Sequence, residues 1–197
     1  MTNKISKGLP SEAYTDKKFW AKECNTIFSN SWVFVGFAHE LKNLGDVLPI
    51  TVGGQPLVLV RNKNGNILAF HNVCSHRCLK LVDRPTNVGK IIRCPYHSWS
   101  YDLDGNLLAS PHFGGTNNHR PKGFTPKDNG LRSIRIKTWH DWIFINLNNN
   151  ALPFEKYAAP LIKQLNNINL EKISPVATLD FGEIFTNWKF LIENFIE

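Results

Sequence analysis

Two cysteines and two histidines stand in two short pairs, and side chains of these types bind metals. Cys74 and His76 are separated by one residue, Cys94 and His97 by two, and seventeen residues lie between the pairs. Thiolates and imidazoles are the usual protein ligands of zinc and of several iron centres. The two pairs therefore predict a metal site built from two loops, each of which gives one sulfur and one nitrogen.

The spacing of the two pairs separates three interpretations. Structural zinc sites usually space their ligand pairs by two to four residues, and Cys74 and His76 stand closer than that. A [2Fe–2S] centre of the Rieske type takes two thiolates on one iron and two imidazoles on the other, so each loop must give one of each. The pattern favours this centre over zinc. Side chains that only pack are the weakest interpretation, because two such pairs beside turns rarely arise by chance.

The two remaining cysteines have no place in this pattern. Cys24 falls in a helical stretch and is interpreted as a small buried hydrophobic side chain. Cys78 follows the first pair and is interpreted as a packed thiol, with a fifth ligand or a disulfide partner as the alternatives. The second loop has no cysteine to pair with it, because Tyr96 stands between Cys94 and His97.

Short strands with tight turns are predicted to hold the two loops. From about residue 45 apolar residues alternate, with turns at Gly53–Gly54, Asn64–Gly65 and Asp104–Gly105. The alternation predicts a small antiparallel β domain over residues 40–147, with both pairs on loops between strands. The predicted strands cover residues 46–52, 56–62, 66–73, 89–94, 98–103, 106–110, 131–139 and 142–147, and residues 110–130 form a long loop.

A helix and a strand are predicted before this domain. Residues 15–28 form a helix that Thr15 caps, with Tyr14 packed back onto Phe19. Residues 31–38 then form a buried strand. The apolar face of the helix consists of Trp20, Cys24, Ile27 and Phe28.

Further elements are predicted after residue 147, so the fold class is α+β and mainly β. Residues 157–170 read as a short helix and residues 176–185 as a strand. Asn187 caps a last helix whose apolar residues recur at i, i+3, i+4, i+7 and i+8, which predicts a core-facing helix. Its apolar face is Trp188, Leu191, Ile192, Phe195 and Ile196. The sequence stops inside this helix, so we expect it to be the front part of a longer chain.

The composition limits the class of protein. The 197 residues include 23 Lys and Arg against 16 Asp and Glu, a formal charge of +7, but the basic residues are scattered. This scatter predicts a solvated surface or attraction to an acidic protein, and no nucleic-acid partner. There is no signal-peptide core and no apolar stretch long enough for a membrane span. We therefore expect a cytoplasmic protein whose four cysteines are thiols or ligands.

The motif "CSHRC…CPYHSW" resembles the cluster-binding motif of Rieske non-haem iron oxygenases, the α subunits of aromatic-ring-hydroxylating and related oxygenases. The resemblance extends over nearly the whole chain. "SWVFVGFAHEL" is similar to the family's lead-in segment, "TWHDWIFINL" to its exit strand and "NWKFLIENFIE" to the opening of its catalytic domain. It implies an N-terminal helix and lead-in strand at residues 1–39, a Rieske domain at 40–147 and the start of a catalytic domain at 148–197.

The resemblance also implies roles for individual residues. Cys74 and Cys94 would bind the buried ferric iron, and His76 and His97 would bind the outer iron, which is the one reduced. The last residue, Glu197, matches the acidic residue that bridges the two metal sites. Two further positions, Arg77 and Trp99, match residues that pack around the cluster.

The sequence also departs from the family pattern. None of the histidines His112, His119 and His140 lies in a segment where it could replace the two His that, with a carboxylate, bind the family's mononuclear iron. Asp141 stands where a Gly is common, and Cys78 where a small residue is common. We therefore expect this chain alone to lack the oxygen-activating iron.

The implied function is electron transfer inside an oxygenase. Electrons from NAD(P)H would arrive through a reductase, with or without a ferredoxin, and pass to a mononuclear iron for hydroxylation or demethylation. The family assembles as a homotrimer, and the "NWKFLIENFIE" segment resembles members that act on quaternary ammonium compounds. A stand-alone Rieske electron carrier and a zinc-stabilised interaction domain are the alternatives.

Overall fold

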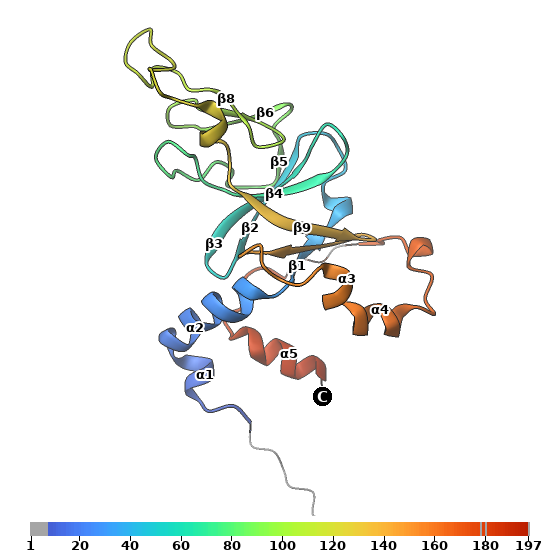
Figure 1. Cartoon of the computed structure of the whole chain (residues 1–197). Coiled ribbons are helices and arrows are strands. Elements are labelled where there is room, and N and C mark those ends of the chain that lie inside the picture. Colours follow the sequence, from blue (N-terminus) through green and yellow to red (C-terminus); the bar gives the residue numbers. More distant parts are fainter. Residues whose placement is uncertain (1–7, 178, 180, 197) are drawn as a thin grey trace, which may run out of the picture.

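The computed structural model describes residues 8–177, 179 and 181–196, and it is built mainly from antiparallel β-sheet (Figure 1). A seven-stranded sheet has the order β1-β10-β9-β4-β3-β2-β5, and a three-stranded sheet has the order β6-β7-β8. The predicted fold class is confirmed. The strands are β1 (Val33–Phe37), β2 (Asp46–Val52), β3 (Gln55–Arg61), β4 (Ile67–His71), β5 (Thr86–Asn87), β6 (Ile91–Arg93), β7 (Ser100–Asp102), β8 (Leu107–Ala109), β9 (Ser133–Trp139) and β10 (Trp142–Asn146).

Glycine turns join the central hairpins as the sequence predicts. Gly53 and Gly54 connect β2 to β3 with φ of 55° and 76°, and Gly65 lies between β3 and β4 with φ of 78°. A two-residue turn with positive φ, as at Gly53–Gly54, suits the twist of the strands that it joins, and Gly65 supplies the left-handed residue of a longer β3–β4 loop. These turns fix the register of β2, β3 and β4, and with it the start of the first metal-type loop after β4.

Strand β3 is buried on both faces and separates two of the three hydrophobic cores in the described residues. Leu57 and Leu59 face one core, and Val58 and Val60 face the other, all with no exposed surface. Successive side chains of a strand point to opposite faces, so one strand serves both cores. The second core also contains Cys74, Cys94, Trp99 and Tyr101, so the metal-type loops form part of the hydrophobic interior.

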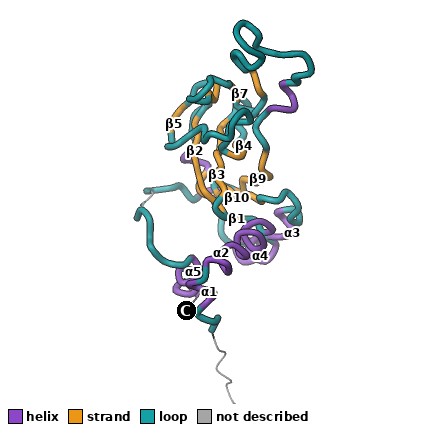
Figure 2. The backbone as a smooth tube through the Cα atoms, turned by 90° about the vertical axis from the view of Figure 1, so that its left-hand side faces the viewer, coloured by secondary structure: helices purple, strands orange, loops and turns teal. Residues whose placement is uncertain are grey.

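The long loop between β8 and β9 extends beyond the small sheet (Figure 2). It contains a 3₁₀ turn at Pro126–Asn129 and otherwise follows the prediction for residues 110–130. Its base is closed by Ser110, whose hydroxyl donates to the His119 carbonyl at 2.7 Å, and by the His112 N–H, which donates to His119 Nδ1 at 2.9 Å.

The N-terminal helix differs from its prediction. Two short helices, α1 (Glu12–Thr15) and α2 (Lys17–Glu23), are followed by a π-helical turn at Cys24–Phe28. Asp16, rather than Thr15, caps α2, because its carboxylate accepts the Lys18 N–H at 2.7 Å. Tyr14 stacks on Phe190 of α5, at 4.5 Å between ring centroids.

The predicted apolar face of this helix was also wrong in part. Trp20 and Ile27 are 41% and 45% exposed, and Cys24 is only half-buried. The buried residue is Glu23, whose carboxylate lies 2.7 Å from the Lys189 ammonium of α5. The helix therefore turns a charged side chain inward because a basic partner distant in sequence meets it there.

The C-terminal part is helical in short pieces, α3 (Phe154–Tyr157), α4 (Ala159–Leu165) and α5 (Trp188–Ile196). No strand forms in the described residues of 176–185, where one was predicted. Asn187 begins α5 as predicted, since its side chain accepts the Lys189 N–H at 3.1 Å.

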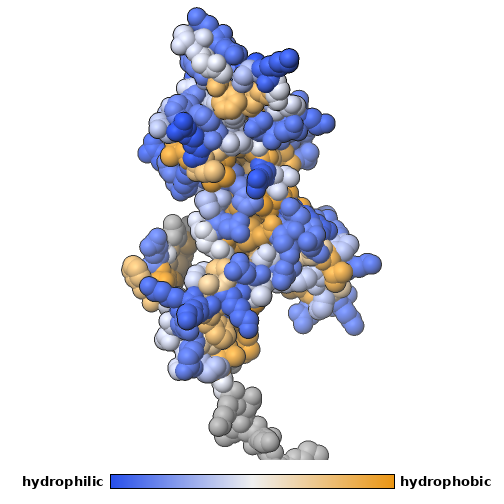
Figure 3. All heavy atoms as spheres, turned by 60° about the vertical axis from the view of Figure 1, so that its left-hand side comes forward, coloured by the Kyte–Doolittle hydropathy of each residue, from blue (hydrophilic) through white to orange (hydrophobic). Residues whose placement is uncertain are grey.

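Helix α5 lies beside α1 and α2 (Figures 1 and 2), but most of its predicted core face is exposed. Leu191 is 43% and Phe195 is 84% exposed, and apolar atoms cover part of this end of the molecule (Figure 3). Other exposed apolar side chains lie in the preceding segment, among them Phe181, Ile184 and Phe185. No helix in the described part of the chain is both long and apolar enough to cross a lipid bilayer.

Candidate metal centre

The first metal-type loop follows β4 and is closed by its own backbone. The Cys74 N–H donates to the Leu79 carbonyl at 2.8 Å, and the Cys74 carbonyl accepts the Cys78 N–H at 2.9 Å. Cys78 has a φ of 55°, in the left-handed region. The loop therefore folds back within six residues and presents His76 near its tip.

The second loop follows β6 and repeats the same backbone turn. The Cys94 N–H donates to the Trp99 carbonyl at 2.8 Å, the Cys94 carbonyl accepts the Ser98 N–H at 3.1 Å, and Ser98 has a φ of 58°. The two cysteines are equivalent in these turns, whereas the histidines are offset by one residue. The positive φ at the fifth position, held by Cys78 in the first loop, is the backbone feature that the two loops share.

The two thiols lie inside the hydrophobic core. Cys74 is 1% exposed and Cys94 is 2% exposed, and the two side chains are within interaction distance of each other. Burial, together with the neighbouring Cys94, raises the pKa of the Cys74 thiol above its ordinary value. Such thiols lose their protons to a bound metal cation rather than to water.

The Tyr101 hydroxyl group is hydrogen-bonded to the Cys74 thiol. Tyr101 has no exposed surface, and its hydroxyl lies 3.2 Å from Cys74 Sγ while accepting the Ser75 N–H at 3.0 Å. Burial, and then the hydrogen bond with Cys74, raise the pKa of Tyr101 above its ordinary value. Tyr101 therefore stays protonated, and its O–H is the donor toward a Cys74 thiolate.

The two imidazoles lie together at the outer side of the thiols. The ring centroids of His76 and His97 are 4.8 Å apart, and the His76 ring stacks on Trp99 at 4.8 Å with an interplanar angle of 6°. Burial lowers the pKa of His76, and electrostatic interactions with His97 and Arg77 lower it further. A neutral imidazole has a free lone pair, which is the form that binds a metal.

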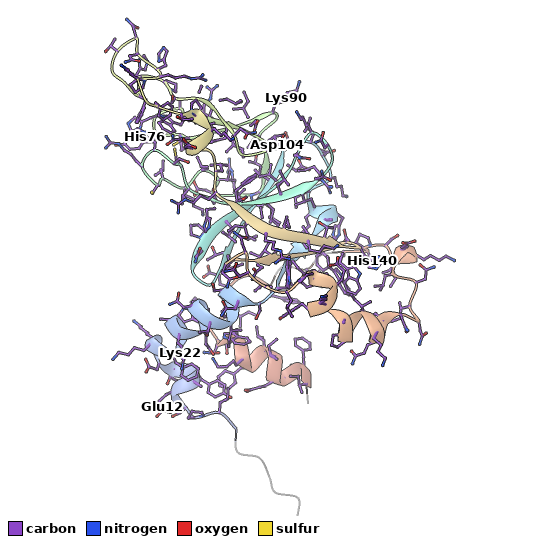
Figure 4. The ribbon with its side chains drawn as sticks, viewed as in Figure 1. Glu12, Lys22, His76, Lys90, Asp104 and His140 are labelled. Atoms are coloured by element: carbon purple, nitrogen blue, oxygen red, sulfur yellow. The ribbon has the colours of Figure 1, made fainter. Side chains whose placement is uncertain are left out.

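A cavity of about 770 Å³ opens beside these imidazoles. It is lined by His76, Arg77, His97, Ser98, Pro111, His112 and Phe113. Phe113 meets the His76 ring edge-on at 5.7 Å and the Trp99 ring at 5.1 Å, so the long loop forms one wall. Figure 4 shows His76 toward one end of the molecule, well away from Glu12 near the other end.

The donor set and one unsatisfied atom fit a [2Fe–2S] group. His97 Nδ1 and Trp99 Nε1 are buried, and neither has a hydrogen-bond partner among the described residues. Of the two, only the imidazole nitrogen can bind a metal, because the indole N–H is a donor only. A buried polar atom without a partner is rare, and a metal ion is one of its ordinary explanations. In the part of the chain that the structure describes, no three His, Cys, Asp or Glu side chains gather as one metal site. A cluster that takes two protein ligands on each iron needs pairs rather than triplets.

The remaining predicted site residues have mixed outcomes. Trp99 is 1% exposed and contacts His76, whereas Arg77 is exposed at the cavity wall. Glu197 lies outside the described residues. Cys78 is exposed, so the prediction of a packed thiol was wrong, because the left-handed turn points it away from the core. Its sulfur forms no disulfide.

Sequence reasoning missed Tyr101 and Phe113. The alternation of β7 predicts that Tyr101 points inward, but only the fold shows that its hydroxyl reaches a sulfur from the other loop. Phe113 lies in a Gly- and Asn-rich loop with no periodicity that could have indicated a packed ring.

Comparisons with known proteins give consistent results. A family profile for the Rieske [2Fe-2S] domain matches residues 31–120. The chain is 34% identical over 187 residues to the glycine betaine monooxygenase oxygenase subunit of Pseudomonas aeruginosa strain UCBPP-PA14, covering 94% of this chain and 42% of that protein. It is 30% identical over 194 residues to the carnitine monooxygenase oxygenase subunit of Escherichia coli strain K12, covering 96% and 50%.

The fold agrees with these sequence matches. The crystal structure of the apo form of a quaternary ammonium Rieske monooxygenase superposes with a TM-score of 0.83 at 27% identity, covering 96% of this chain and 54% of that one. The chain thus spans about half the length of the relatives that it matches.

Proposed function

Because this chain contains a Rieske [2Fe-2S] domain and is homologous to the N-terminal part of Rieske oxygenase α subunits, we propose that it performs the electron-transfer step of an oxygenase component. The observation that carries the proposal is the pairing of two buried thiols with two adjacent, half-exposed imidazoles on matching turns. An electron must enter and leave the centre, so one side of it must reach the surface while the other stays shielded from water.

We further propose that four residues hold the cluster. Cys74 and Cys94 would bind the inner iron, which their burial supports, and His76 and His97 would bind the outer iron, which the cavity beside them supports. When bound, the cluster supplies a one-electron redox centre.

The surrounding residues have separate tasks in this proposal. Tyr101 donates a hydrogen bond toward Cys74, and the ring of Trp99 orients His76. Phe113 excludes water from one side of the imidazoles, because its ring packs on both His76 and Trp99.

The activity of the whole protein is part of the same proposal. We infer that electrons derived from NAD(P)H reach the centre through a reductase, with or without a ferredoxin, and serve O₂-dependent hydroxylation or demethylation at a mononuclear iron. The names of the relatives support a quaternary ammonium substrate of the betaine or carnitine type. A homotrimer, a bridging role for Glu197 and the domain division at residues 39 and 147 belong to this proposal.

A cytoplasmic location is also proposed, and the cysteines support it. All four are unpaired, which is usual in a reducing compartment.

Reconstitution of the purified chain with iron and sulfide under anaerobic conditions tests the cluster assignment. We expect a red-brown protein with about two irons and two sulfides per chain, and a Rieske-type electron-resonance signal after reduction. His97→Ala should abolish this signal. His119→Gln should keep this signal, because His119 lies in the long loop at the same end of the molecule and is not a proposed ligand.

Two results would count against the proposal. A colourless protein that holds one zinc per chain would replace it with a zinc-stabilised domain. A cluster with the usual Rieske signal in His97→Ala would show that another residue ligates the outer iron.

A further inference from the structure

We propose that an acidic electron-carrier protein docks beside the first metal-type loop and delivers its electron to the centre on the side of Cys74. The proposal rests on the proposed function, because it requires a redox centre held by the two loops. It goes beyond that function by assigning the face at which electrons arrive and the charge of the protein that brings them.

The first loop separates two cavities that share no lining residue. Its tip residues His76 and Arg77 border the cavity of about 770 Å³ beside the imidazoles, whereas Cys74, Ser75 and Cys78 border a second cavity of about 370 Å³. The second cavity is completed by His71, Val73, Asp128, Asn129, Gly130 and Arg132. The proposed centre is therefore approachable from the side of its imidazoles and from the side of its first thiol.

The second cavity brings a docked protein close to the inner iron. Cys74 forms part of its wall although this residue is only 1% exposed. A protein seated over the cavity would therefore contact a residue that holds the inner iron. An electron that rests on the outer iron leaves through the imidazoles, so the side of the thiol is left for the arrival of the next one.

Hydrogen bonds hold the two segments of this cavity wall together. The Ser75 hydroxyl donates to the Gly130 carbonyl at 2.9 Å, and the His71 N–H donates to the Arg132 carbonyl at 2.9 Å. Leu131, between these two carbonyls, is buried in the same core as Cys74. A surface fixed in this way needs little reordering when a partner binds, which lowers the entropic cost of binding.

The charge of this end of the molecule favours an acidic partner. Residues 72–132, less than a third of the chain, include nine Lys and Arg against four Asp and Glu, which is +5 of the formal charge of +7. All nine basic residues are exposed, whereas Asp102 and Asp104 are half-buried and accept hydrogen bonds from neighbouring residues. Such a field attracts a negatively charged protein and raises its association rate.

Two basic residues place part of this charge at the second cavity. Arg132 lines the cavity, and Lys127 is adjacent to the lining residue Asp128. Neither basic residue forms an ion pair with any residue that the structure describes. Their charges are therefore available to a partner, and Asp128 is the acidic lining residue that opposes them.

An electron carrier needs only a small docking surface. Transient redox complexes bury less than about 1,200 Å² in total, because the carrier must leave again after each electron. Leu79, which follows Cys78 and is 40% exposed, offers an apolar contact among the basic residues of this end. A shallow cavity with a basic border is therefore sufficient for such a partner.

Reduction of the reconstituted 197-residue chain by an acidic plant-type [2Fe–2S] ferredoxin tests this surface. One electron passes from the reduced ferredoxin, which is oxidised, to the cluster, which is reduced, and no bond is made or broken. The step is favourable because plant-type ferredoxins have lower potentials than Rieske centres. We expect a second-order rate by stopped-flow absorbance that falls at least about tenfold between about 0.01 M and about 1 M salt.

Charge reversals separate this face from the rest of the basic end. Arg132→Glu and Lys127→Glu should each slow the reduction about fivefold at low salt, and Asp128→Asn should speed it about twofold. Lys90→Glu is the matched control, because it reverses an exposed basic residue at the same end of the molecule, away from His76 (Figure 4). It should change the rate less than about twofold. Voltammetry of each variant reports separately whether its cluster is intact.

Three results would overturn this inference while the cluster assignment stands. They are no reduction by the ferredoxin of a cluster that the electrode reduces, rates that do not fall with salt, and rates in Arg132→Glu and Lys127→Glu that equal the rate in Lys90→Glu. The last result would show that the charge of the whole end, and not this face, guides the partner. A chain that binds no cluster would instead overturn the proposed function, and this inference with it.

Discussion

Removing the hydroxyl of Tyr101 should lower the reduction potential of the proposed cluster. Tyr101→Phe keeps the buried ring and removes the hydroxyl group, whose oxygen lies 3.2 Å from Cys74 Sγ. A donor to a sulfur ligand stabilises the reduced cluster more than the oxidised one, because the reduced cluster has the greater negative charge. Without the donor, the reduced form loses more stability and the potential falls.

The magnitude follows from the strength of the hydrogen bond. A hydrogen bond to a charged group contributes about 1.5–3 kcal/mol. If the oxidised form of the cluster keeps half of this, the difference between the two redox states is about 0.75–1.5 kcal/mol. For a one-electron couple, about 1.4 kcal/mol corresponds to ~59 mV, so the expected decrease is about 30–65 mV.

Protein-film voltammetry on the reconstituted chain measures this change. Tyr96→Phe is the matched control, because it removes a tyrosine hydroxyl from the second loop where that ring is 60% exposed and its hydroxyl makes no hydrogen bond with the described residues. The stability of Tyr101→Phe should be measured as well, since the Ser75 N–H also loses its acceptor. A potential that rises, or that equals that of Tyr96→Phe, would refute the reasoning.

Three further predictions follow from the same structure. The reduction potential of the unmodified chain should be low for a Rieske centre, nearer about −150 mV than +300 mV, because Tyr96 stands where high-potential Rieske proteins have a disulfide cysteine. A potential above roughly +150 mV by voltammetry would contradict this. Glu23→Gln should lower the free energy of unfolding, measured by urea denaturation, by about 3–5 kcal/mol, because it leaves the buried Lys189 ammonium without an opposite charge. Replacing both Glu23 and Lys189 with apolar residues should recover much of this loss. Gly45→Ala should lower the stability of the fold far more than Gly65→Ala, although both glycines have φ near +80°. A Cβ at Gly45 would lie 2.1 Å from a backbone oxygen, whereas one at Gly65 would have no atom within 4 Å. Gly65→Ala should therefore cost only about 1–2 kcal/mol of backbone strain, and equal decreases in melting temperature for the two variants would contradict this reasoning.

Local patterns were sufficient for the central strands. The alternation in β2, β3 and β4, and the glycines between them, predict elements that the structure contains within a residue or two. The two-residue strand β5 (Thr86–Asn87) was missed, because so short a strand has no period and is defined only by its pairing with Asp46 and Val47.

Helix faces were predicted less well, for a physical reason. Periodicity identifies a side of a helix but does not say what will cover it. Glu23 is buried because Lys189, which is 166 residues further along the chain, meets it. Such partners cannot be read from a window of fifteen residues.

The same limit applies at the metal centre. The spacing of Cys74, His76, Cys94 and His97 was readable, and the structure places the two thiols beside each other and the two imidazoles beside each other. The contact of Tyr101 with the first thiol depends on how two loops are stacked, and the sequence contains no sign of that.

The pairing of β1 with β10 sets an order of events during synthesis. Val33 lies opposite Ile145, so the first strand of the large sheet cannot pair until residue 145 has left the ribosome. Contacts between residues so far apart in sequence form slowly, because the intervening chain loses conformational entropy. The two turns at Cys74 and Cys94 close within six residues each and need no such wait. The proposed cluster ligands therefore lie on turns that can form in a nascent chain while its large sheet is still open.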